Sequence, residues 1–268
     1  MIRLNDFLDR LSIIKVLSFF LFLMLFLTLI PILFKFTLGS LSFKFILYFI
    51  MLLFLAYKLN NVDLGDISLK NALKNEYDSI FKVSDIYHIL FIVIANILFV
   101  SAIYFLLRYL SILSIIQFDS PLFGDFSTLS VSVLVLYLLT VVILSPIIEE
   151  TLFRGIFLRR FNKELVNVTL AILISSVLFG ICHSFGGILG AILFGICVSI
   201  LYIKSRNILV PIFAHFLNNL ISFLLALSGI ENFIQGNLVV IFAIIVLAIV
   251  SNFVLFKAII NEWPRKME

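Results

Sequence analysis

The chain alternates long apolar runs with short polar segments. The runs are long enough for helices that cross a bilayer, because about 20 residues of α-helix span a hydrocarbon core of about 30 Å. The predicted spans are residues 13–34, 42–59, 86–107, 128–160, 165–185, 187–203, 209–227 and 237–260. We therefore predict an all-α polytopic membrane protein with eight transmembrane helices in a single integral membrane domain, residues 1–268.

Two segments depart from a simple crossing. Residues 60–85 place apolar side chains at helical spacing among charged ones, which predicts a short amphipathic helix on the membrane surface. Residues 128–160 continue the helical pattern for too long to cross the bilayer once without a bend. Pro146 lacks a backbone N–H, so we predict a kink or a break at Ser145–Pro146.

Composition and charge indicate the protein class and its orientation. Hydrophobic residues make up 63% of the chain and charged residues 13%, which excludes a soluble domain. With the N-terminus in the cytoplasm, all but three of the 19 lysines and arginines fall on the inner side. The exceptions are Lys35, Lys44 and Arg108. Positive charge favours the cytoplasmic side, so both termini are predicted to be cytoplasmic. We expect a multi-pass protein of the cell membrane, and the Phe-, Ile-, Leu- and Lys-rich composition favours a bacterial plasma membrane.

A charged cluster, Glu149 to Gly155, interrupts the fourth apolar run. A charge at the centre of a bilayer costs about 2.5–3.5 kcal/mol on insertion scales, so the cluster marks either a functional site or the end of a span. Glu150 and Arg154 are four residues apart on one helical face, in the order that favours an ion pair. Glu149 has no such partner in sequence and is the acid expected to be available for chemistry.

Two histidines and an asparagine are the other polar residues of interest in the late spans. His183 lies near the end of the fifth span, and His215 and Asn219 share one face of the seventh. Each histidine alone could be a hydrogen-bonding residue between helices. Together with Glu149 they predict a shared site in the inner half of the membrane.

Such a site suits hydrolysis. Glu149 can act as general base on a water that His183 orients, while His215 and Asn219 donate hydrogen bonds to an oxyanion. Glu149, His183 and His215 could instead bind zinc or another divalent metal with an open fourth position. The motif His-Glu-x-x-His is absent, and the residues alone leave both alternatives open.

Three motifs carry a resemblance to a known family, in this order: Glu149-Glu150-x-x-x-Arg154, Phe179-x-x-x-His183 and His215-x-x-x-Asn219. They resemble the CAAX protease and bacteriocin-processing (CPBP, Abi) family of intramembrane proteases. The resemblance implies a catalytic core at residues 128–228 and peptide-bond cleavage near the cytoplasmic leaflet. It implies that Glu149 and His183 activate water, that His215 and Asn219 hold the oxyanion, and that Glu150 and Arg154 support the site. It favours a glutamate-activated water with no bound metal, so no cofactor is expected.

The resemblance leaves several roles open. The expected function is intramembrane endopeptidase activity on a membrane-associated peptide or protein, in peptide maturation or bacteriocin self-immunity. The alternative is a non-enzymatic membrane scaffold that regulates a partner membrane protein. A proton-coupled transporter would also use buried Glu and His, but the chain has no internal repeat. The expected partners are the substrate and the lipid bilayer, with no nucleic acid, and the sequence does not indicate an oligomeric state.

Overall fold

The computed structural model describes residues 4–63, 68–83, 86–118, 121–123, 126 and 129–266, which contain helices and no strand. Residue 128, the first of the predicted core 128–228, lies outside the described residues, as do residues 64–67 and 84–85 of the predicted polar connection. The elements are α1 (Leu4–Asp9), α2 (Ile13–Leu33), α3 (Ser40–Asn60), α4 (Leu69–Val83), α5 (Ile86–Ile112), α6 (Val131–Tyr137), η1 (Leu138–Leu144), α7 (Ser145–Glu150), η2 (Thr151–Leu158), α8 (Arg159–Leu165), α9 (Val168–Ile181), η3 (Phe185–Gly187), α10 (Ile188–Ser205), α11 (Leu209–Ser228), α12 (Ile230–Gln235) and α13 (Leu238–Glu262).

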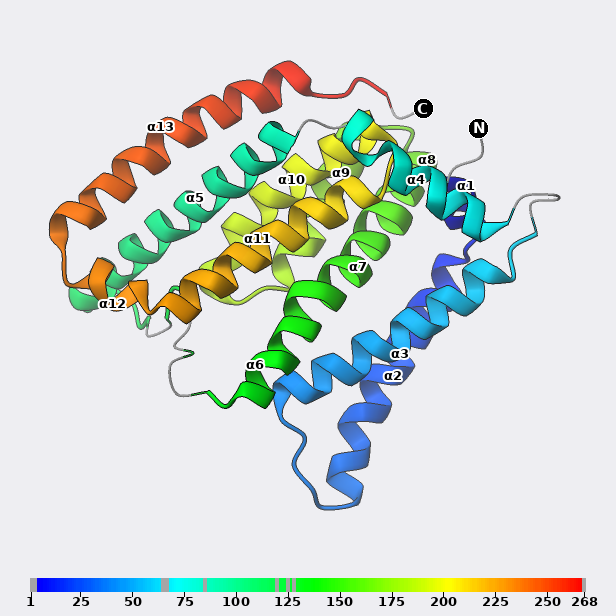
Figure 1. The fold of residues 1–268 in the computed structure, drawn as a ribbon, viewed down its shortest axis with the longest axis horizontal. Coiled ribbons are helices and arrows are strands. Elements are labelled where there is room, and N and C mark those ends of the chain that lie inside the picture. Colours follow the sequence, from blue (N-terminus) through cyan, green and yellow to red (C-terminus); the bar gives the residue numbers. More distant parts are fainter. Residues whose placement is uncertain are drawn as a thin grey trace.

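The all-α polytopic class is confirmed, with one difference in the spans. Among the described residues, seven helices are long and apolar enough to cross a membrane. The predicted span 165–185 is shorter, because α9 has 14 residues and a length of about 21 Å. Both termini lie on the same side of the bundle (Figure 1), which requires an even number of passes. The short helix α9 therefore makes the eighth pass.

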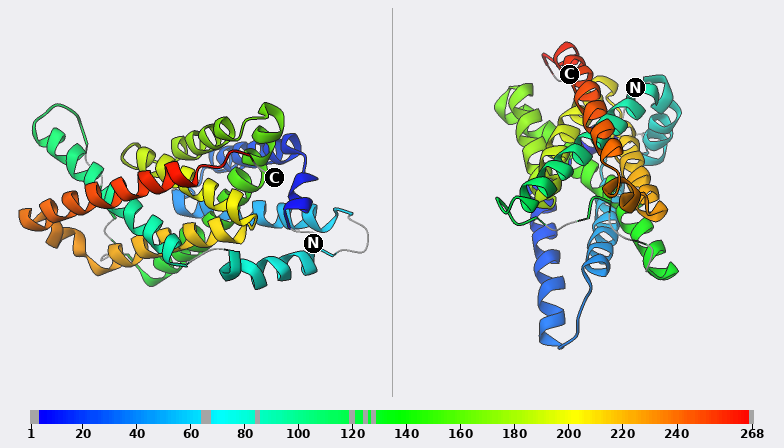
Figure 2. Two further views of the ribbon diagram at one scale, coloured as in Figure 1. Left: turned by 90° about the horizontal axis from the view of Figure 1, so that it is seen from above. Right: turned by 90° about the vertical axis from the view of Figure 1, so that its left-hand side faces the viewer.

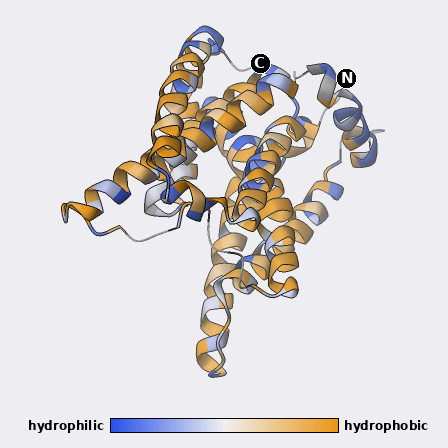
Figure 3. Ribbon diagram, turned by 60° about the vertical axis from the view of Figure 1, so that its left-hand side comes forward, coloured by the Kyte–Doolittle hydropathy of each residue, from blue (hydrophilic) through white to orange (hydrophobic). Residues whose placement is uncertain are grey.

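The protein is a multi-pass membrane protein, and its polarity is distributed accordingly. Most of the ribbon is hydrophobic, and hydrophilic residues gather on the side that carries both termini (Figure 3). The amphipathic helix predicted within residues 60–85 is α4, which lies on that side (Figure 1). Asn207 at the start of α11 donates a hydrogen bond from Nδ2 to the Glu76 carbonyl of α4, over 2.7 Å. Asn5 of α1 accepts one from the Tyr202 hydroxyl of α10, over 2.6 Å.

The helix continues through Pro146, where a kink or a break was expected. Residues Val131–Leu165 form one continuous helical stretch of 35 residues. Segments η1 and η2 are π-helical and flank the short α-helix α7. In η1 the backbone N–H of Ser145 reaches the carbonyl of Thr140, five residues back. In the same five-residue pattern, residue 146 would donate to the carbonyl of Val141, but Pro146 has no N–H to donate. Such π-helical turns are frequent at functional sites.

Four elements meet around the middle of this stretch. Helices α2 and α3 form a hairpin that projects from the rest of the bundle (Figure 2), and α3 packs against η1 and α7. Helix α11 packs against the same two segments, and α9 packs against α10 and η2. Helix α9 ends at Ile181, and residues 182–187, which include η3, connect it to α10.

Candidate active site

The predicted ion pair between Glu150 and Arg154 is present and fully buried. The Arg154 Nη1 atom lies 3.1 Å from Oε1 and 3.0 Å from Oε2 of Glu150, and both side chains are 0% exposed. The guanidinium also donates from Nη2 to the Gly195 carbonyl over 3.1 Å. Its carbon lies 4.5 Å from the ring centre of Phe179, a cation–π distance. Arg154 therefore joins η2 to α9 and α10.

Gly195 makes room for this guanidinium. A Cβ at position 195 would lie 3.0 Å from Arg154 Nη2 and 3.1 Å from Ser176 Cβ. Both distances are shorter than ordinary van der Waals contacts. A side chain at this position would require Arg154 or Ser176 to shift by a few tenths of an ångström, so the close approach of α9 and α10 favours glycine here.

His215 is held by the same ion pair. Its Nδ1 atom lies 2.7 Å from Glu150 Oε1. The carboxylate already pairs with Arg154, so it accepts the bond and Nδ1 carries the proton. The other ring nitrogen, Nε2, lies 4.0 Å from Oε2 of Glu149. That distance is too long for a direct hydrogen bond, but it leaves room for a water about 2.8 Å from each atom to bridge them.

Glu149 is anchored by one of its two oxygens. The Tyr48 hydroxyl donates to Oε1 over 2.6 Å, the Ser145 hydroxyl donates to the same oxygen, and Lys44 Nζ lies 3.7 Å from it. Oε2 is the oxygen nearest His215. The side chain is 12% exposed. Glu149 was predicted to be the acid without a partner. Among the described residues its Oε1 has three partners, and its Oε2 accepts no direct hydrogen bond.

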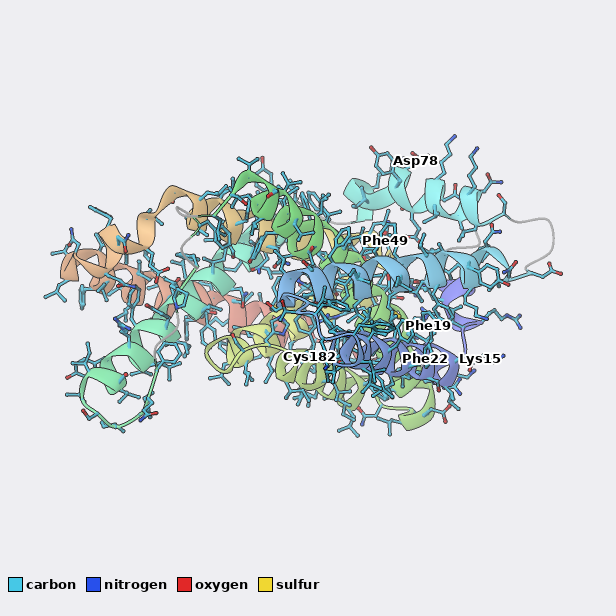
Figure 4. The ribbon with its side chains drawn as sticks, turned by 90° about the horizontal axis from the view of Figure 1, so that it is seen from below. Lys15, Phe19, Phe22, Phe49, Asp78 and Cys182 are labelled. Atoms are coloured by element: carbon cyan, nitrogen blue, oxygen red, sulfur yellow. The ribbon has the colours of Figure 1, made fainter. Side chains whose placement is uncertain are left out.

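His183 reaches the site from a loop rather than from a helix. It follows Cys182, which lies just beyond α9 and is labelled in Figure 4. The His183 Nδ1–H donates to the Phe179 carbonyl over 2.9 Å. The Phe179 ring centre lies 4.7 Å from the His183 ring and 5.6 Å from the His215 ring, so the two imidazoles flank one phenyl group. Among the described residues, no hydrogen bond joins His183 to Glu149.

Asn219 contacts the π-helical turn. Its Nδ2 donates to the Val141 carbonyl over 2.8 Å, the carbonyl five residues before Pro146. Its Oδ1 accepts from Asn218 Nδ2 over 3.4 Å, and Asn218 in turn accepts from Asn96 of α5 over 3.2 Å. These contacts fix the orientation of the Asn219 amide. A primary amide carries two N–H groups, so one N–H of Asn219 remains for a ligand.

Sequence reasoning did not find the contribution of α3. Lys44 was assigned to the outer flank by the charge count, and Tyr48 was not considered, yet both contact Glu149. Their four-residue spacing within an apolar run was a usable signal for a shared helix face. Ser145 precedes Glu149 by four residues, and that spacing was also visible.

The possible metal ligands do not converge. In the part of the chain that the structure describes, no group of three or more His, Cys, Asp or Glu side chains could hold a metal ion. The Nδ1 atoms of His183 and His215 are both engaged by protein acceptors. These bonds leave Nε2 of each histidine as the possible ligand atom, but Glu149, His183 and His215 do not come together as a three-ligand metal centre among the described residues, and we derive no step through a metal.

Comparison with known proteins shows which family the segment that contains this site resembles. Residues 131–221 match the model of the family described as type II CAAX prenyl endopeptidase Rce1-like. The resemblance to CAAX proteases is confirmed. The matched segment contains all six residues predicted for the site: Glu149, Glu150, Arg154, His183, His215 and Asn219.

One curated relative supports the same resemblance. The chain is 34% identical over 94 residues to a Bacillus subtilis (strain 168) protein named "Putative membrane peptidase YdiL". The alignment covers 35% of this chain and spans 38% of the length of that relative. No solved structure gives a significant match. Lys44 and Tyr48 lie outside the Rce1-like segment, so the matched family model does not include the α3 contacts.

The hydrogen bond from Tyr48 predicts a measurable effect. For the hydrolysis that the resemblance implies, we expect Tyr48→Phe to lower kcat about 10–100-fold with KM unchanged. A hydrogen bond to a charged group contributes about 1.5–3 kcal/mol, and about 1.4 kcal/mol corresponds to a factor of ten. The matched control is Tyr57→Phe, because Tyr57 is on the same helix and 64% exposed. Equal kcat values for Tyr48→Phe and the control would show that the hydroxyl does not position Glu149.

Proposed function

We propose that the protein is an intramembrane endopeptidase that uses Glu149 to activate a water molecule. The observation that carries the proposal is the 4.0 Å separation between Glu149 Oε2 and His215 Nε2. Both atoms are acceptors when His215 is neutral with its proton on Nδ1. One water can donate a hydrogen bond to each of them, which leaves its lone pairs directed at a substrate carbonyl.

The reaction follows from this geometry. Glu149 takes a proton from the water, and the resulting hydroxide adds to the carbonyl carbon of the peptide bond. The carbonyl electron pair moves to oxygen and forms a tetrahedral oxyanion. When this intermediate collapses, the C–N bond breaks and the proton held by Glu149 passes to the leaving amine. The products are one new carboxyl terminus and one new amino terminus.

The remaining residues have distinct roles in the proposal. Glu150 and Arg154 keep His215 in the tautomer that accepts from water. Asn219 donates its second N–H to the oxyanion, as the resemblance implies. The resemblance pairs Glu149 with His183, but His215 is the histidine within ion-pair distance of Glu149. We therefore assign His215 to the water. His183 Nε2, which carries no proton while Nδ1 donates to the Phe179 carbonyl, relays the Glu149 proton to the leaving amine.

The substrate class follows from the environment of the site. The described surface is apolar along the spanning helices, so a peptide that reaches Glu149 is itself membrane-associated. The name of the matched family mentions prenyl endopeptidases, which makes a lipid-modified peptide the first substrate to examine. We propose cleavage near the cytoplasmic leaflet of a bacterial plasma membrane, in peptide maturation or bacteriocin self-immunity.

A non-enzymatic scaffold is the second candidate. It would use the same helices to bind a partner membrane protein and would not need Glu149. The three hydrogen-bonding or ionic partners on Glu149 Oε1 favour the enzyme, because they hold a carboxylate in an apolar bundle at a cost that a scaffold would not require.

Metal independence is a further expectation of this mechanism. We expect that dialysis against a chelator leaves the hydrolysis rate unchanged, because Glu149 and His215 activate the water without a metal. The matching measurement is elemental analysis of the purified protein before and after dialysis. Loss of activity that returns only when zinc is added would contradict the metal-free mechanism.

The experiment that tests the proposal uses isotopically labelled water. Purified protein in liposomes is incubated with a pool of internally quenched peptides, farnesylated and unmodified, in heavy-oxygen water. Hydrolysis places one heavy oxygen atom in each new carboxyl terminus, which mass spectrometry detects. Absence of cleavage throughout the pool, with correctly folded protein, would favour the scaffold.

A further inference from the structure

Lys44 is a cation inside an apolar helix, at the edge of the site. Its Nζ lies 3.7 Å from Glu149 Oε1 and 5.2 Å from the ring centre of Tyr48. The side chain is 40% exposed, compared with 12% for Glu149, so the ammonium group lies on the more open side of this pair. Lys44 belongs to none of the three motifs and precedes the Rce1-like segment.

The charges of the site show what Lys44 balances. Glu150 and Arg154 form a buried pair at 3.0 Å and neutralise each other. The remaining anion is Glu149. Among the described residues, its ion-pair partner of the lysine or arginine type is Lys44. With both histidines neutral, Lys44 therefore supplies the positive charge that balances Glu149 in the resting site.

Catalysis moves this negative charge. When Glu149 takes a proton from water it becomes neutral, and the charge appears on the oxygen of the tetrahedral intermediate. Lys44 is then left beside a neutral acid and a new anion. A cation already placed where charge develops stabilises the transition state, and low dielectric strengthens the interaction.

The site needs such a group, because its other donors are largely engaged. His215 donates from Nδ1 to Glu150, and His183 donates from Nδ1 to the Phe179 carbonyl. In their neutral forms both leave Nε2 as an acceptor. Asn219 has one N–H remaining after its bond to the Val141 carbonyl. A tetrahedral oxyanion commonly receives more than one donor.

We propose that Lys44 is a catalytic residue whose ammonium group balances Glu149 at rest and stabilises the oxyanion during peptide hydrolysis. This inference rests on the proposed function. It assigns to α3 a direct part in the reaction, in addition to the positioning of Glu149 by Tyr48. The flexible lysine stem lets the ammonium follow the charge from the carboxylate to the oxyanion.

The test compares charge retention with charge removal at position 44. The variants are Lys44→Met, Lys44→Arg and Glu149→Gln. The control is Lys58→Met, because Lys58 is on the same helix and lies over the Phe54 and Tyr57 rings, away from Glu149. Each variant is purified, placed in liposomes and assayed with the same pool of farnesylated and unmodified internally quenched peptides.

We expect Lys44→Met to lose about 10²–10³-fold in kcat, the usual effect of removing one oxyanion donor. Lys44→Arg should retain most of the activity because it keeps the charge, and Lys58→Met should match the wild type. If Lys44→Met does not elute as folded protein, Lys44→Gln replaces it, because glutamine is neutral but polar.

The outcomes separate the two proposals. Wild-type kcat in the neutral Lys44 variant, with Glu149→Gln inactive, would overturn the role of Lys44 and leave the proposed function standing. Equal loss in Lys44→Met and Lys44→Arg would also overturn it, because charge would not be the property that matters. Wild-type cleavage by Glu149→Gln, or no cleavage by the wild type, would remove the proposed function itself.

Discussion

Replacing Glu149 with glutamine is expected to reduce peptide hydrolysis by about 10²–10⁴-fold, the usual contribution of a general base. Glutamine retains the size of the side chain and can still accept from Tyr48, but it cannot take a proton from water. The variant should insert and fold, because the change removes a charge from an apolar bundle. The rate is measured on purified protein in liposomes with internally quenched peptides.

The matched control for this variant is Glu164→Gln. Glu164 is part of the same continuous helical stretch, is 61% exposed, and pairs with Arg160 at 3.2 Å. The same chemical change at this position should leave the rate unchanged. A Glu149→Gln protein that cleaves as fast as this control would remove Glu149 from the reaction.

Replacing Arg154 with methionine is expected to lower the free energy of unfolding by about 3–5 kcal/mol, the usual cost of breaking a buried pair. The change leaves Glu150 charged and 0% exposed, with His215 as its remaining partner. It also removes the bond to the Gly195 carbonyl and the contact with Phe179. Thermal or denaturant unfolding in detergent micelles measures the change.

The control is Arg160→Met, six residues along the same helical stretch. Arg160 is 47% exposed in its pair with Glu164, and exposed pairs contribute about 0–1 kcal/mol. The double variant Glu150→Gln, Arg154→Met should recover part of the lost stability, because it leaves no unpaired buried charge. If Arg154→Met is no less stable than Arg160→Met, the buried pair does not hold the site together.

Hydrophobic pattern and charge placement were sufficient to predict most of the fold. The ends of the long helices are within a few residues of the predicted spans, since apolar length alone defines a crossing. A kink or a break was predicted at Ser145–Pro146, and the break is wrong because Val131–Leu165 is one continuous helical stretch. The chain stays helical through Pro146, with π-helical segments before and after it, and Asn219 of α11 donates to the Val141 carbonyl nearby. That partner comes from another helix and is invisible to local pattern.

The sequence was a better guide to which residues form the candidate site than to how these residues contact one another. Helical spacing predicted the ion pair between Glu150 and Arg154, and the structure contains it. Spacing could not show that Glu150 also holds His215, because that contact joins residues 65 positions apart. The bond from Tyr48 to Glu149 spans 101 positions, and it depends on how the α2–α3 hairpin packs against η1 and α7.

The central claim is that Glu149 performs peptide hydrolysis on membrane-associated substrates. The most direct measurement is comparative analysis of peptide termini in membranes from cells that carry the wild-type chain or Glu149→Gln at equal abundance. The account predicts a set of new termini in the wild-type membranes that is absent from the Glu149→Gln membranes. Identical termini in both membranes would contradict it.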